Sequence, residues 1–158
     1  MGVVGPRLLF PPNAEGQFTI QSAGGLYDVG KGPFHRFLGW DADDPHVTKT
    51  EKVQWVTGAA FMTPRALFHQ VDGFDEAYGR GYFEECDYCE RVKALGLEVW
   101  YCPESTMVHY TGQSMTAASK TPAQIQAATK SFRENSWRFH AAHDARIKPD
   151  TTLQWVLY

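Results

Sequence analysis

The chain has 158 residues, and its 15 lysines and arginines against 18 aspartates and glutamates give a formal net charge of −3. With 43% hydrophobic and 21% charged residues, it can build a real core, which excludes intrinsic disorder and favours one domain over residues 1–158. Near-neutral charge without a basic cluster argues against nucleic-acid binding through phosphate neutralisation. The apolar stretches are far shorter than the roughly 20 residues that span a bilayer, and the first residues lack a signal-peptide pattern, so we expect a cytoplasmic protein.

Three cysteines, Cys86, Cys89 and Cys102, are an odd number, which argues against a disulfide framework and for a reducing compartment. Together with His109 they could form a Cys3His zinc site. The alternative, which we prefer, is that Cys86 and Cys89 are small apolar residues of a helix and that Cys102 lies in a strand. A redox role for the Cys-x-x-Cys pair is disfavoured because Asp87 between the cysteines opposes a thiolate.

The front of the chain, residues 1–52, holds many glycines and prolines and predicts short strands separated by turns. A buried strand is expected over residues 3–10, interrupted by Gly5–Pro6, and a second extended piece over residues 18–20. Residues 24–44 predict a long loop, and the aromatic residues within it favour a functional loop over a disordered one.

The back of the chain, residues 53–158, has a more regular pattern. Residues 53–62 predict a strand with Gly58 at a bulge or a close backbone approach. Thr63 as N-cap and Pro64 at the first helical position open a short helix that ends near residue 71. The remaining predicted elements are a helix over residues 84–95 stopped by Gly96, strands over 98–102 and 106–110 separated by Pro103, and a helix over 122–143.

The acidic start of the predicted 84–95 helix is the most informative segment. Acidic residues in a first helical turn are stabilised by the helix dipole, each by about 0.3–1 kcal/mol, and Asp87 with Arg91 has the i,i+4 spacing of an ordinary ion pair. Glu84 lies on the same face as that pair and has a structural explanation too. Glu85 instead lies at the open end of the apolar stripe, where partial desolvation raises a carboxyl pKa and suits a general base. Structural ion-pair networks produce similar patterns, so both interpretations of Glu85 stay open.

Several segments occur in a specific order: residues 57–62 read TGAAFM, 71–76 read VDGFDE, 82–96 read YFEECDYCERVKALG and 107–114 read MVHYTGQS. Their order and spacing resemble the C-terminal half of family 2 glycosyltransferases of the rhamnosyltransferase-like kind. The front segment GVVGPRLLFPPNAEGQFTIQSAGG resembles the same family, so the resemblance covers nearly the whole chain. It implies an α/β fold: a partial GT-A-type mixed sheet with flanking helices, lacking the N-terminal nucleotide-binding half.

The resemblance also implies roles for individual residues. Glu85 falls on the family aspartate that deprotonates the acceptor hydroxyl, and the extra methylene of glutamate moves the carboxyl oxygen. A misplacement of about 1 Å can cost roughly 100-fold in rate. The glutamate in place of aspartate therefore affects how well Glu85 would serve as the catalytic base. The candidate acceptor-binding residues are Glu84, Asp87, Arg91, Trp55 and Gly58.

The sequence gives less support for metal-binding residues than for the acceptor-side residues. Enzymes of this family bind Mg²⁺ or Mn²⁺ through an Asp-x-Asp motif that stabilises the leaving diphosphate. Asp41 and Asp43 have that spacing, but they lie in the glycine-rich loop without a preceding apolar strand. His109 falls on a histidine that contributes to the metal–diphosphate site in many relatives. The alternative is that His109 is a strand-end histidine bonded to a backbone carbonyl.

Three interpretations therefore stay open. The first is the acceptor-binding part of an inverting glycosyltransferase, which uses a nucleotide-sugar and a sugar acceptor and works in the cytoplasm, with peripheral binding at the inner membrane face if the acceptor is lipid-linked. The second is a non-catalytic carbohydrate-binding or partner-binding module. The third is a structural subunit that completes a separate nucleotide-binding half, or that self-associates, because a shortened sheet exposes an edge. The second interpretation would use aromatic side chains that are otherwise expected in the core: Trp40, Trp55, Trp100 and Tyr110.

Overall fold

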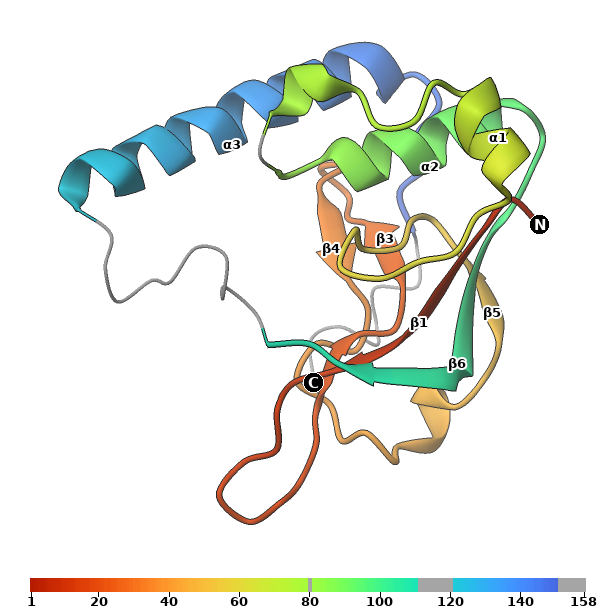
Figure 1. Ribbon diagram of the computed structural model, residues 1–158, viewed down its shortest axis with the longest axis vertical. Coiled ribbons are helices and arrows are strands. Elements are labelled where there is room, and N and C mark those ends of the chain that lie inside the picture. The colour runs from red at the N-terminus through yellow and green to blue at the C-terminus, as the bar shows by residue number, and fades with distance from the viewer. Residues whose placement is uncertain (80, 111–120, 151–158) are drawn as a thin grey trace.

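A computed structural model describes residues 1–79, 81–110 and 121–150, and within them helices form a layer over a curled mixed sheet (Figure 1). In the sheet, β1 (Val3–Leu9) pairs with β6 (Val99–Val108) in parallel, and the outer strands β2 (Ile20–Ser22) and β5 (Glu51–Val53) pair with them in antiparallel fashion. The predicted mixed α/β architecture is therefore confirmed. Across the sheet the order is β2, β1, β6 and β5.

The two central strands each continue where the sequence predicts an interruption. Pro6 is paired with Cys102, but the next residue, Arg7, is paired with Thr106, so three residues of β6 bulge out of the ladder. Proline has no N–H to give to a ladder and is tolerated where pairing is already disturbed. The interruptions expected at Gly5–Pro6 and Pro103 are therefore wrong: both prolines lie at one shared bulge, and both strands continue through it.

The segment predicted as one long loop, residues 24–44, contains a hairpin. β3 (Gly25–Tyr27) pairs with β4 (Pro33–His35), and the Asp28 carboxylate closes the turn by accepting from the N–H of Gly32 at 2.9 Å. Every residue of β3 is buried. The loop prediction is wrong here because a turn-rich composition does not distinguish a coil from short strands that pack on a core.

Trp55 lies in the core against this hairpin. Its indole is 3% exposed and donates to the carbonyl of Leu26 at 2.9 Å. The ring lies so close to Gly25 that a Cβ on that glycine would come within 2.0 Å of it. The aromatic face of Trp55 is thus covered by protein, as the core interpretation expects for this residue, whereas Tyr110 is 58% exposed.

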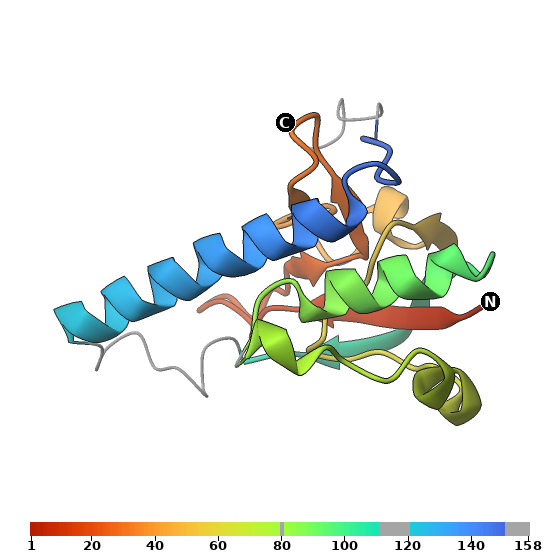
Figure 2. The ribbon, with the colours of Figure 1, turned by 90° about the horizontal axis from the view of Figure 1, so that it is seen from above.

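The helices follow the predicted positions closely. α1 (Arg65–Gln70) begins one residue later than expected, with Pro64 rather than Thr63 as N-cap, because the Thr63 hydroxyl donates instead to the carbonyl of Gly2. α2 (Glu84–Ala94) and α3 (Pro122–His143) lie side by side (Figure 2). Two short 3-10 helices complete the set, η1 (Pro45–Val47) and η2 (Glu76–Tyr78).

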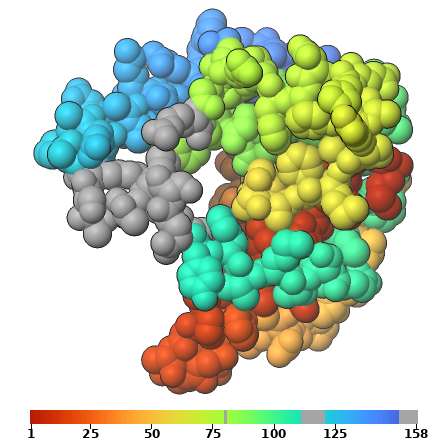
Figure 3. Space-filling view, in the orientation of Figure 1, coloured from red at the N-terminus to blue at the C-terminus, as the bar shows by residue number. Residues whose placement is uncertain are grey.

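The segment between β5 and α1 is mostly irregular. The strand predicted over residues 53–62 ends at Val53, and two isolated bridges follow it, from Trp55 to Gly25 and from Met62 to Val4. In Figure 3 the yellow residues of this segment lie between the helical layer and the strands. Gly58, which belongs to this segment, therefore lies next to the start of α2.

The N-terminal part of α3 extends beyond the rest of the molecule (Figures 1 and 2). Phe139, near its other end, is fully buried in the core, whereas Ile125 and Phe132 on the same face are about half exposed. Among the described residues, no helix is long and apolar enough to span a membrane. The predicted turn at Gly112 and Ser114 and the apolar tail beyond Asp150 lie outside the described residues.

Candidate active site at the start of α2

The backbone turns sharply just before α2. Positive φ angles occur at Gly79 (69°), Gly81 (146°), Tyr82 (75°) and Phe83 (77°). Glycine adopts such angles freely, but for a bulky residue each costs of order 1–3 kcal/mol and is found mainly at functional sites. The Phe83 ring is buried, 5.3 Å from the ring of Phe132, so packing holds the strained turn in place.

Glu84 and Glu85 follow this turn as the first two residues of α2. Each carboxyl group has one buried oxygen, Oε2, that finds no hydrogen-bond partner among the described residues. The turn at Gly58 lies directly against them: a Cβ placed on Gly58 would be 3.6 Å from the Glu85 Cβ and 3.8 Å from Glu84 Oε1. Because buried polar atoms are nearly always paired in folded proteins, two unpaired carboxyl oxygens together point to a ligand site.

The environment of Glu85 changes its proton affinity. Burial, followed by the negative charge of Glu84, raises the pKa of Glu85 from 4.5 to about 7, against smaller opposing contributions from the backbone N–H groups of Glu85 and Gly58. Desolvation penalises the ionised form, and a like charge nearby adds to that penalty. The direction agrees with the expectation from the apolar stripe. A carboxyl with a pKa near neutrality can take up a proton from a substrate hydroxyl and release it again.

Asp87, one turn further along α2, is engaged differently. It is 5% exposed, and its Oδ2 accepts from Arg91 Nε at 2.7 Å, so the predicted ion pair is confirmed. Its Oδ1 accepts from His143 Nε2, also at 2.7 Å. Burial acts to raise the pKa of Asp87, but the hydrogen bonds from His143 and Arg91 outweigh it and hold that pKa below its usual value. Arg91 also donates to the carbonyls of Val71 and Gly73, so this pair ties α2 to its surroundings.

Two residues of α3 that the sequence analysis did not single out complete this region. Asn135 is buried, and its side-chain nitrogen lies within hydrogen-bond distance of the carbonyls of Tyr78, Gly81 and Tyr82. His143 makes the bond to Asp87. A sequence signal existed: Asn135 and His143 interrupt the apolar stripe of α3, three residues after Phe132 and four after Phe139. A polar side chain on a buried stripe must find partners.

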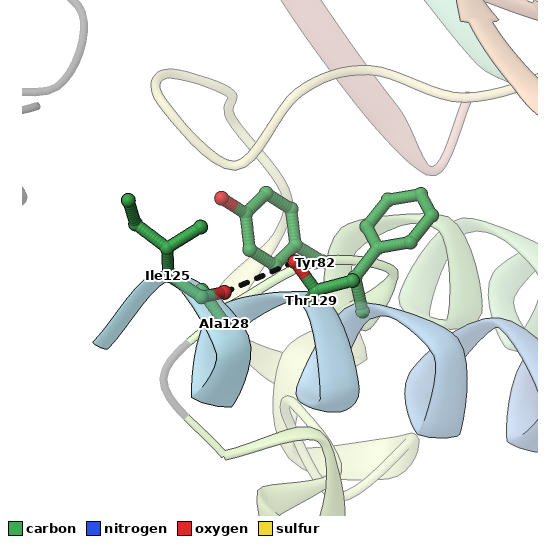
Figure 4. Close-up of a pocket in the computed structure, with 5 residues that line it drawn as sticks. Tyr82, Ile125, Ala128 and Thr129 are labelled. Atoms are coloured by element: carbon green, nitrogen blue, oxygen red, sulfur yellow. Dashed lines mark hydrogen bonds between the residues drawn. The ribbon is translucent and has the colours of Figure 1, made fainter. Parts of the chain in front are cut away.

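An open groove of about 280 Å³ lies beside the turn (Figure 4). The Tyr82 ring forms one wall and stacks edge-on against Phe132 at 5.5 Å. The other wall is α3, and its lining is mostly apolar. The groove is lined by Tyr82, Ile125, Ala128, Thr129 and Phe132. Tyr82 is therefore shared between this groove and the turn that leads to the carboxyl pair.

The metal candidates are not brought together. Asp41 Oδ1 accepts from the N–H of Asp43 within a tight turn at 2.8 Å, and His109 Nδ1 pairs with Gln21 Oε1 at 2.9 Å. His109 thus bonds a side-chain amide rather than the backbone carbonyl considered above. Across residues 1–79, 81–110 and 121–150, no three His, Cys, Asp or Glu side chains are placed to hold a metal ion.

The cysteines match the preferred interpretation. Cys86 and Cys89 are free and buried on the core face of α2, and Cys102 is a half-buried residue of β6. Burial raises the pKa of the Cys89 thiol to about 12, so it is protonated and unreactive at neutral pH. Cys102 Sγ donates to Glu104 Oε2 at 3.2 Å. Cys86 and Cys89 thus belong to the packed core.

Comparison with known proteins relates this chain to glycosyltransferases. It is 30% identical over 135 residues to the N-acetylglucosaminyl-diphospho-decaprenol L-rhamnosyltransferase of Mycobacterium tuberculosis, a match that covers 80% of this chain and 42% of that enzyme. It is 22% identical over 160 residues to uncharacterized protein y4gI of Sinorhizobium fredii, covering 98% of this chain and 17% of that protein. No protein-family model matches. The chain thus spans less than half the length of the curated relatives it matches.

A solved structure has a similar fold. A solved structure of GalNAc-T7 with UDP, GalNAc and Mn²⁺ superposes with a TM-score of 0.52 at 13% identity, over 90% of this chain and 30% of that one. At this identity the likeness concerns the fold alone. Sequence similarity to a rhamnosyltransferase and structural similarity to GalNAc-T7 therefore agree on a glycosyltransferase-like chain.

Proposed function

We propose that this chain is the acceptor-side part of an inverting glycosyltransferase and that Glu85 is its catalytic base. The observation that carries the proposal is the Glu85 carboxyl: it lies at the first turn of α2, has a buried oxygen without a partner among the described residues, and has a pKa raised to about 7. This combination suits a group that accepts a proton only when a substrate hydroxyl fills the site.

In the proposed reaction Glu85 removes the proton from an acceptor hydroxyl. The hydroxyl oxygen attacks the anomeric carbon of the donor sugar, and the bond to the nucleoside diphosphate breaks with its electron pair leaving on the diphosphate. A single displacement inverts the configuration of the anomeric carbon. Glu84, whose charge raises the pKa of Glu85, strengthens the base, while Gly58 leaves the approach to the two carboxyl groups open because it has no side chain.

A divalent cation, Mg²⁺ or Mn²⁺, would stabilise the leaving diphosphate in such a reaction, and GalNAc-T7 is described with UDP and Mn²⁺. The described residues offer no cluster that fits such an ion, so no step through it is assigned to this chain. We assign the cation and the nucleotide to a separate nucleotide-binding half. Asp41, Asp43 and His109 stay candidates only as contributors to a site shared with that half.

The acceptor in this proposal is a lipid-linked saccharide. The relative from Mycobacterium tuberculosis is named for an N-acetylglucosaminyl-diphospho-decaprenol acceptor, which suggests synthesis of a cell-wall polysaccharide at the inner face of the membrane. Asp87 and Arg91 act on the acceptor indirectly, by holding the start of α2 in place.

The proposal is tested with the polypeptide that contains this chain, a nucleotide-sugar and an N-acetylglucosaminyl-diphospholipid acceptor in Mn²⁺ buffer. Replacement of Glu85 by Gln is expected to lower kcat at least 100-fold with little change in KM, since loss of a general base typically costs about 10²–10⁴-fold. Glu85→Asp, which keeps a carboxyl group, should retain measurable turnover. Full activity in Glu85→Gln, or a product with retained anomeric configuration, contradicts the proposal. Acceptor binding without turnover by the unaltered protein favours the non-catalytic carbohydrate-binding module.

A further inference from the structure

Helix α3 holds the turn before α2 through one amide. Asn135 is 5% exposed, and its Nδ2 lies 2.8 Å from the carbonyl oxygen of Tyr78, 3.0 Å from that of Gly81 and 3.1 Å from that of Tyr82. An amide nitrogen has two protons. Three acceptors around it therefore use its full donor capacity, with one proton shared between two carbonyls.

The turn needs such a clamp because of its backbone. Tyr82 and Phe83 both have positive φ angles, which bulky side chains avoid unless the surroundings over-determine them. The same helix adds apolar contacts: Phe132 packs on both of these rings, at 5.5 Å and 5.3 Å, and Phe139 packs on Phe83 at 5.5 Å. Backbone and side chains of the turn are thus held by residues of a single helix, α3, that follow the turn by about 50 residues in the sequence.

The clamp leads directly to the carboxyl pair. Phe83 is the N-cap of α2, and its carbonyl accepts from the N–H of Asp87 at 2.8 Å. A rotation at Phe83 therefore turns the first helical turn. It would move Glu84 and Glu85 away from Gly58, which lies within ordinary van der Waals reach of them.

We propose that Asn135 is a positioning residue for the Glu84–Glu85 carboxyl pair, because its amide holds the backbone at Tyr78, Gly81 and Tyr82 in the conformation that places both carboxyl side chains against Gly58. An effect of Asn135 on catalysis depends on the proposed role of Glu85 as the base. The positioning itself is a property of the folded chain and can be measured without any glycosyl transfer.

The test compares the Asn135→Asp variant with the unaltered chain. Aspartate has the same shape as asparagine, but its ionised carboxylate has no proton to donate to the three carbonyls. The readout is the titration of the Glu85 carboxyl by ¹³C NMR with labelled glutamate, the signal being assigned with Glu85→Gln. In the unaltered chain the titration midpoint is expected near pH 7. In Asn135→Ala it should fall by about one pH unit or more, because a released turn exposes the carboxyl group to water. In Asn135→Asp the added negative charge opposes part of this effect, so the fall should be smaller.

Two control variants separate positioning from general stability. Arg133→Gln, at an exposed site of the same helix, should leave the midpoint unchanged. Tyr101→Phe removes a buried hydrogen bond to the carbonyl of Val47 in the distant sheet and should lower the melting temperature without moving the midpoint. Asn135→Ala, which removes the amide without adding charge, should shift the midpoint in the same direction as Asn135→Asp.

Three results overturn the proposal: an unchanged midpoint in the folded Asn135 variants, an equal shift in Tyr101→Phe, or failure of both Asn135 variants to fold, which makes the residue structural only. These results are independent of the proposed function. If Glu85→Gln stays active while the Asn135 variants shift the midpoint, Glu85 is not the base but Asn135 still positions it.

Discussion

His143 Nε2 lies 2.7 Å from Asp87 Oδ1, so the end of α3 is bonded to α2 inside the core. The other ring nitrogen of His143 accepts from Arg146 Nη2, also at 2.7 Å. Because an arginine is always a donor, Nδ1 is the accepting nitrogen of this ring and Nε2 faces the Asp87 carboxylate. With Arg91 on its other oxygen, Asp87 is the centre of a buried network that joins the two helices next to the carboxyl pair.

Breaking this network should be costly. Asp87→Asn leaves Arg91 without its charge partner, and removing one member of a buried ion pair typically costs about 3–5 kcal/mol. We expect the free energy of unfolding to fall by about 3 kcal/mol in urea titrations. A double-mutant cycle with His143→Gln should give non-additive losses, since the two side chains share one hydrogen bond. Simple additivity would mean that the contact contributes nothing.

The contribution of Asp87 should also depend on pH. The folded-state pKa of Asp87 lies below its ordinary value of 3.8, so the unfolded chain takes up the proton first as the pH falls. The stability gained from ionised Asp87 is therefore present above pH 3.8 and lost as the pH drops through the folded-state pKa. The difference in unfolding free energy between the unaltered chain and Asp87→Asn should be constant near neutrality and shrink in acid. A constant difference down to pH 3 contradicts this account.

Glu85 should act in the opposite direction. Its folded-state pKa is about 7 against an ordinary 4.5, so the folded chain prefers the protonated carboxyl. Stability associated with Glu85 is complete below pH 4.5 and is lost as the pH rises to 7, by up to about 3 kcal/mol.

Glu85→Gln removes this penalty, and thermal melts should therefore show a variant that is more stable than the unaltered chain at pH 8 but not at pH 4. A gain in stability from removing a functional group is expected where a site trades stability for activity. An equal difference at both pH values would show that the Glu85 pKa is ordinary.

Two glycines offer a matched pair of alanine substitutions. Gly58→Ala places a methyl group in ordinary van der Waals contact with the carboxyl pair, so stability should change by less than about 0.5 kcal/mol, while turnover falls because the methyl group covers the approach to Glu85. Gly25→Ala drives a Cβ to within 2.0 Å of the Trp55 ring and should lower the melting temperature sharply, since overpacking costs about 1–3 kcal/mol or more. Equal effects of both on stability would contradict the assigned packing.

Local signals predicted the helices well. Gly96 predicts the end of α2, the helical spacing of apolar residues predicts α3, and the spacing of Asp87 and Arg91 predicts their ion pair. The apolar stripe that ends at Glu85 predicts the direction of its pKa shift. Each of these follows from residues within a few turns of one another.

Contacts between residues that are far apart in the sequence could not be predicted from such local signals. The place of Asn135 on an apolar stripe predicts that its amide needs hydrogen-bond partners. The spacing along α3 does not predict which distant carbonyls accept those hydrogen bonds. The shared bulge at Pro6 and Pro103 depends on β1 and β6 lying next to each other. The burial of Trp55 depends on a hairpin within a segment whose composition resembles a loop.

The parallel pairing of β1 with β6 has a consequence for how the chain is made. Val3 is paired with Val99, so the central ladder cannot form until the 96 residues that follow Val3 have left the ribosome. Such high contact order predicts slow folding, and until then β1 is an apolar strand with free edges, open to aggregation. A nascent chain stalled before residue 99 should therefore need a chaperone or remain unfolded, whereas one that includes β6 and both long helices can acquire protease resistance.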